Sequence, residues 1–124
     1  MTDGKTPGTI SPRTLVSLPA EIDVTNARRI RGVLMSAAVA GVSTVVADLS
    51  RTVFCDCEGA YSLAQAYTQM AGKGVDLRLV TPAQAIRRVF AMLTLDRVVP
   101  LYDSLDERIT AEPGRADGTG PVAA

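Results

Sequence analysis

The segment Val45-Val-Ala-Asp-Leu-Ser-Arg-Thr-Val-Phe-Cys-Asp-Cys-Glu-Gly59 joins an apolar run to a polar turn and then to a helix. The run from Val45 to Leu49 hardly alternates, which is typical of a strand buried on both faces. The helix is predicted over Glu58 to Ala71, and its first turn leaves backbone N–H groups unpaired. We expect Asp56 to cap this helix and Glu58 to complement its dipole, because negative charge is stabilised there.

Strand and helix patterns alternate along the rest of the chain. Strands are predicted near residues 15–18, 21–23, 45–49, 75–80 and 98–102, and helices near 25–39, 58–71, 81–93 and 104–110. Alternation of this kind implies crossover connections and a mostly parallel central sheet of about four to five strands. The sequence therefore predicts an α/β fold.

Helical periodicity identifies the buried side of each helix. The predicted buried positions are Ile30, Val33, Leu34 and Ala37 in the first helix, Ala60, Leu63, Ala64, Tyr67, Met70 and Ala71 in the second, and Ile86, Val89, Phe90 and Leu93 in the third. The arginines Arg28, Arg29 and Arg31 are interpreted as a solvated face, with contact to an acidic partner as the alternative.

Local signals mark the ends of these helices. Gly72 and Gly74 are predicted to end the second helix with positive φ angles. Thr81 is predicted to cap the third helix, with Pro82 at its first position. The run Ser104-Leu-Asp-Glu107 has the form of a capping box and predicts a short final helix.

Length and composition favour one domain. The chain has 124 residues, of which 47% are apolar, and 13 acidic residues balance 13 basic ones. The balance gives no sign of a nucleic-acid footprint, and no apolar run approaches the roughly 20 residues of a membrane span. We expect a cytoplasmic domain over residues 13–111, between a flexible lead-in (1–12) and a disordered tail (112–124), both rich in glycine and proline.

The chain contains no histidine. This excludes Ser-His-Asp and Cys-His catalysis and removes the commonest metal ligand. Two cysteines alone cannot complete a usual zinc site, and no glycine-rich nucleotide motif occurs. We therefore expect no enzyme activity, no catalytic residue, no metal and no cofactor.

Three carboxylates and two cysteines remain as candidate site residues. Asp23, Asp56 and Glu58 could serve acid–base chemistry or bind a cation, but helix capping explains the last two. Cys55 is interpreted as a buried apolar residue. Cys57 stands at a helix N-terminus, which lowers a thiol pKa, while the neighbouring carboxylates raise it. Redox sensing by Cys55 and Cys57 therefore stays open as an alternative.

The series Asp48-Leu49-Ser50, Phe54 and Asp56-x-x-Gly59 resembles the signature of the STAS domain, as found in anti-sigma factor antagonists. Further matching pieces are Ala20 to Asp23, Gly74 to Val80 and Leu95 to Tyr102, so the resemblance covers roughly residues 13–111. It implies a mixed sheet with about four helices mainly on one side. It also implies that the chain binds a kinase-type anti-sigma factor and controls sigma-factor-dependent transcription, as a monomer or weak homodimer.

In that family the residue before the glycine is the serine or threonine that the partner kinase phosphorylates. Here that position is Glu58, which cannot accept a phosphoryl group, and Cys57 precedes it. The resemblance implies a partner-facing surface; its expected residues are Asp23, Asp56, Cys57, Glu58, Gly59, Tyr61, Ser62 and Gln65. Ser62, one helical turn on, is a candidate substitute acceptor. Ala20 and Thr94 replace family glycines and are expected to affect only local geometry.

The resemblance leaves two points open. Glu58 could fix either a binding or a non-binding state. The loss of the phosphoacceptor also fits a second class, the STAS accessory subunits of lipid or solute transporters.

Overall fold

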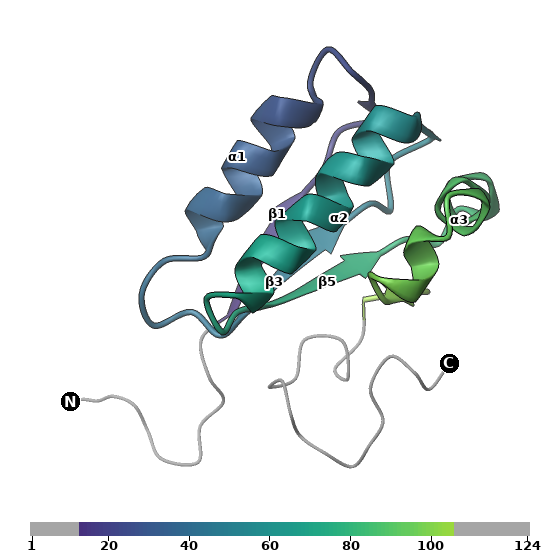
Figure 1. The fold of residues 1–124 in the computed structure, drawn as a ribbon. Helices are drawn as coiled ribbons and strands as arrows, with labels where there is room; N and C mark the ends of the chain where they lie inside the picture. Colours follow the sequence, from purple (N-terminus) through teal and green to yellow (C-terminus); the bar gives the residue numbers. More distant parts are fainter. Residues whose placement is uncertain (1–12, 106–124) are drawn as a thin grey trace.

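The computed structural model describes residues 13–105, in which two helices cover one face of a parallel sheet (Figure 1). In chain order the elements are β1 (Arg13–Ser17), β2 (Glu21–Ile22), α1 (Ala27–Ala37), β3 (Thr44–Asp48), β4 (Phe54–Cys55), α2 (Cys57–Ala71), β5 (Asp76–Val80), α3 (Gln84–Met92), the 3-10 helix η1 (Leu95–Arg97) and β6 (Leu101–Tyr102). The main sheet has the order β1-β3-β5-β6, and β2 pairs with β4 in a second, two-stranded sheet. The α/β prediction is confirmed.

Two details of that prediction change. Every strand pair within residues 13–105 is parallel, so the mixed sheet is not found in this range. The same range holds three α-helices rather than about four. The predicted helix at 104–110, the lead-in and the tail lie wholly or mostly outside the described residues.

The core lies between the main sheet and the helices α1 and α2. Val45 and Ala47 of β3 point into it, together with Leu77 and Leu79 of β5. Val46, between the first two, is also buried, on the opposite face of the sheet. Strand β3 is therefore buried on both faces, as its unbroken apolar run predicts.

The pairing of β2 with β4 positions the candidate site. Glu21 lies opposite Phe54, and Ile22 lies opposite Cys55. Parallel strands end at the same edge of a sheet. The loop after β2 and the turn that begins α2 therefore meet, although they are far apart in the sequence.

Two positions predicted to be buried and one predicted helix-end geometry differ in the structure. Val33 is 48% exposed, because α1 packs through the stripe that contains Ile30 and Leu34. Ala71, at the last turn of α2, is exposed. Gly74 has the predicted positive φ of 79°, but Gly72 has a φ of −66° and stays in the right-handed region.

The third helix begins later than its local signals predict. Residue Ala83 occupies the N-cap position, and Thr81 makes no side-chain cap. The N–H of Thr81 instead donates to the carbonyl of Tyr102, 2.8 Å away, which extends the β5–β6 pairing. Strand β6 begins at Leu101 rather than near Val98, because the N–H groups of Val98 and Val99 donate to the carbonyl of Leu95 in the turn that closes η1.

Candidate functional site

The turn at the N-terminus of α2 is organised by Asp56. Its Oδ1 accepts a hydrogen bond from the N–H of Gly59 at 2.8 Å, so Asp56 caps the helix as predicted. Its Oδ2 accepts a second bond from the N–H of Val24 at 3.2 Å. One carboxylate therefore joins the helix to the loop that follows β2.

That loop is stabilised by Asp23. The carboxylate of Asp23 accepts hydrogen bonds from the hydroxyl and the N–H of Thr25, and these bonds lower the pKa of Asp23 below its usual value. The side chain of Asn26 accepts from the N–H of Asp23 at 2.9 Å and donates to the carbonyl of Glu21 at 2.8 Å. Asp23 therefore stays charged and holds a defined loop beside the α2 turn.

The first turn of α2 is densely packed beneath this surface. Gly59 is buried, and a Cβ atom added there would lie 2.7 Å from Cγ2 and 2.9 Å from the backbone oxygen of Ile22. It would also lie 3.1 Å from Sγ of Cys55. Gly59 therefore lets α2 approach β2 closely and sets the position of the turn rather than offering a contact.

Glu58 and Cys57 are both exposed at this turn. Glu58 lies in the first turn of α2, where the helix dipole stabilises negative charge. Together with Asp23 and Asp56 it gives this end of the molecule an acidic character. Among residues 13–105 no three Cys, Asp or Glu side chains lie close enough to hold a metal ion, so the geometry gives no support to a cation site.

Exposed apolar side chains accompany the carboxylates. Phe54 is 49% exposed and Tyr61 47% exposed, and Val24 and Val53 are exposed as well. Only Tyr61 was expected here as a surface contact. The alternation in β4, where Phe54 points out and Cys55 points in, is the signal that identifies Phe54.

Further along α2, the two remaining predicted residues, Ser62 and Gln65, differ in exposure. Gln65 is exposed, and its side chain accepts a hydrogen bond from the Arg31 guanidinium of α1. Ser62 is only 9% exposed and belongs to the buried side of the helix, which corrects its expected place on the outer face. Helix α2 buries a wide stripe because it packs against α1, the sheet and β4.

The two cysteines have opposite environments. Cys55 is buried and Cys57 is exposed, and neither is in a disulfide. Burial raises the pKa of Cys55 to about 12, with smaller contributions from Asp56 and Cys57. A neutral, buried thiol is a poor nucleophile. This gives no support to a redox role that uses both cysteines.

We expect iodoacetamide at pH 8 to modify one thiol of the native protein. Cys57 should react and Cys55 should stay unmodified until the chain is unfolded, because only Cys57 is exposed and Cys55 is held neutral. Peptide mass mapping measures this, with Cys57→Ser as the control that should abolish native labelling. Modification of Cys55 at a similar rate would contradict the burial of its thiol.

No helix within residues 13–105 combines the length and the apolar character that crossing a membrane requires.

Comparisons with known proteins agree with the fold. The family model of the STAS domain matches residues 5–108. The crystal structure of an anti-sigma factor antagonist from Mycobacterium paratuberculosis is similar, with a TM-score of 0.67 and 30% identity, covering 77% of this chain and 81% of that one. Among curated proteins, no sequence matches significantly.

More distant structures share the fold. The anti-sigma factor antagonist SpoIIAA in its unphosphorylated form has a TM-score of 0.59 at 20% identity, over 81% of this chain and 88% of that one. The phosphorylated form of SpoIIAA from Bacillus has a TM-score of 0.57 at 21% identity, over 83% of this chain and 91% of that one. A sulfate transporter family protein from Wolinella succinogenes has a TM-score of 0.68 at 14% identity, over 82% of this chain and 87% of that one.

Proposed function

This chain belongs to the STAS domain family, and from that premise we propose that it binds a kinase-type anti-sigma factor and so controls sigma-factor-dependent transcription. The protein acts by binding, without chemistry of its own, in the cytoplasm and as a monomer or weak homodimer. The similarity to an anti-sigma factor antagonist at 30% identity supports this choice within the family.

The docking surface is the end of the molecule where the loop after β2 meets the start of α2. We define it by the exposed residues Val24, Phe54, Glu58, Tyr61 and Gln65, with Asp23 and Asp56 holding its two segments. Aromatic side chains are enriched at protein interfaces and often carry much of the binding energy. Half-exposed Phe54 and Tyr61 beside carboxylates are the observation that carries the proposal.

Glu58 removes phosphorylation control from this turn. A phosphoserine carries about −1.5 to −2 charges and three acceptor oxygens, whereas glutamate carries one charge and two oxygens. Ser62 is an unsuitable substitute, because its hydroxyl lies on the buried side of α2 and is out of reach of a kinase in the folded protein. We therefore propose that binding is constitutive at this site and that Glu58 forms part of the contact.

The test begins with affinity capture from lysate of the cell that makes the protein, under reducing conditions, followed by identification of the captured proteins by mass spectrometry. We expect an anti-sigma factor with a kinase fold. Binding of the purified partner to Tyr61→Ala should weaken at least tenfold, about 1.4 kcal/mol, because a half-exposed aromatic side chain of the surface is lost.

The control is Val39→Ala, which removes an apolar side chain that is 57% exposed and lies beyond the other end of α1. It should bind like the parent protein.

The same kinase, supplied with ATP, should phosphorylate Glu58→Ser but not the parent at this position. Capture of transporter components instead would establish the accessory-subunit class. Equal binding by Tyr61→Ala would overturn the assigned surface.

A further inference from the structure

A second feature of the molecule lies away from this docking surface. A groove of about 720 Å³ runs between α3, η1 and β6, with Tyr67 of α2 on its wall. Tyr67 follows Glu58 by nine residues, roughly 14 Å along the helix axis. The groove is therefore separate from the surface that the proposed function uses.

The lining of the groove is basic overall. The lining includes three arginines, Arg87 and Arg88 from α3 and Arg97 from η1, against one carboxylate, Asp96. Within residues 13–105 neither Arg88 nor Arg97 takes part in an ion pair. Both are exposed, so their guanidinium groups are available to a ligand.

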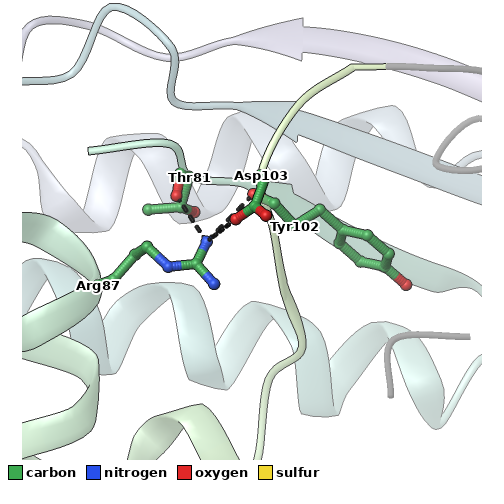
Figure 2. A network of polar contacts seen from close by, with 4 residues as sticks. All are labelled: Thr81, Arg87, Tyr102 and Asp103. Atoms are coloured by element: carbon green, nitrogen blue, oxygen red, sulfur yellow. Dashed lines mark hydrogen bonds and ion pairs between the residues drawn. The ribbon is translucent and has the colours of Figure 1, made fainter. Parts of the chain in front are cut away.

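Arg87 is held in place by the fold, as Figure 2 shows. Its Nη1 donates to the carbonyl of Thr81 at 2.9 Å and, more weakly, to the carbonyl of Tyr102 at 3.5 Å. The same atom lies 3.0 Å from Oδ1 of Asp103, whose side chain is 86% exposed. These contacts use one nitrogen of the guanidinium and fix the whole group at the end of β5 and β6.

The rest of the lining is mostly apolar. It includes Ala91, Pro100 and Leu101, and Tyr67 adds an aromatic ring. Small-molecule sites typically have volumes of about 300–1,000 Å³ and combine apolar walls with a few polar groups. Arginine is the side chain best suited to paired hydrogen bonds with phosphate.

We propose that this groove binds a small organic phosphate. Arg88 and Arg97 hold the phosphate, Arg87 adds a fixed positive charge, and Tyr67 with Leu101 contacts the apolar part of the ligand. The inference is independent of the anti-sigma factor proposal, because no residue of the docking surface lines the groove.

The experiment titrates the isotope-labelled full chain with phenyl phosphate and follows amide shifts by NMR. Two further probes, inorganic phosphate and phenol, each present half of this ligand. We expect shifts at Tyr67, Ala91 and Arg97, and an affinity for phenyl phosphate at least tenfold higher than for either half. The double variant Arg88→Gln, Arg97→Gln should weaken that binding at least tenfold. Arg87 is left intact because it holds α3 to the sheet.

The matched control is Arg28→Gln, Arg29→Gln, which removes the same charge from exposed positions on α1. It should leave the affinity unchanged. Absence of shifts, equal binding by the groove variant, or an equal loss in the control would each overturn the proposal. Shifts caused by a glutamate-rich peptide but not by phenyl phosphate would assign the groove to an acidic polypeptide and also overturn it.

Discussion

Replacing Gly59 with alanine is expected to lower the free energy of unfolding by about 1–3 kcal/mol. The new methyl group would lie 2.7 Å from Cγ2 and 2.9 Å from the backbone oxygen of Ile22. That oxygen cannot easily move away, because it accepts the N–H of Asp56 at 3.1 Å. The variant must therefore shift α2 away from β2.

Thermal or urea unfolding measures this effect, and the midpoint temperature should fall by roughly 5–20 °C. The matched control is Gly32→Ala in the middle of α1, where an added Cβ meets no atom within 4 Å. Alanine has a higher helix propensity than glycine, so the control should gain about 0.5–1 kcal/mol. A stable Gly59→Ala protein would show that the close approach of α2 to β2 is not required.

The second large effect is expected at Asp56. Its replacement by alanine removes the cap of α2 and the bond to the N–H of Val24 together. Loss of an N-cap costs about 0.5–2 kcal/mol, and an unmade hydrogen bond at the loop adds to this. We expect a total loss of about 2 kcal/mol, measured by urea unfolding, and weaker partner binding because the two segments of the docking surface separate.

Asp56→Asn distinguishes the two roles of this side chain. Asparagine is a good N-cap residue, and its single amide oxygen can accept the N–H of Gly59. Its NH₂ group would then face the N–H of Val24 and cannot accept it. The variant should keep most of the stability of the parent but lose affinity for the partner. Equal stability of the alanine variant and the parent would contradict the capping role.

The signals that predicted the fold correctly act over short stretches of chain. The unbroken run Val45 to Leu49 predicted a strand buried on both faces, and Asp56 predicted the start of α2. Gly74 adopts the positive φ that its position after α2 suggested. Each depends on the preferences of a few adjacent residues, which the sequence states directly.

Two of the incorrect predictions concern residues whose place depends on contacts between distant segments. Thr81 and Pro82 have the chemistry of a helix start, but Thr81 pairs with Tyr102 of β6 and the helix begins at Gln84, two residues after the predicted first position. Ser62 was placed on the outer face of α2, but this helix is packed on more sides than a surface helix and buries it. The tertiary environment decided both positions.

The features of the candidate site also fall into those that local sequence predicts and those that depend on tertiary contacts. The sequence by itself determined the acidic turn, the cap at Asp56 and the glutamate in place of a phosphoacceptor, because these follow from residue types at fixed spacing. Only the tertiary structure joined Asp56 to Val24, 32 residues away, and left both Phe54 and Tyr61 half-exposed. It also assembled the basic groove from α2, α3, η1 and β6. Surfaces of this kind form when the chain packs, and no local preference encodes which segments will meet.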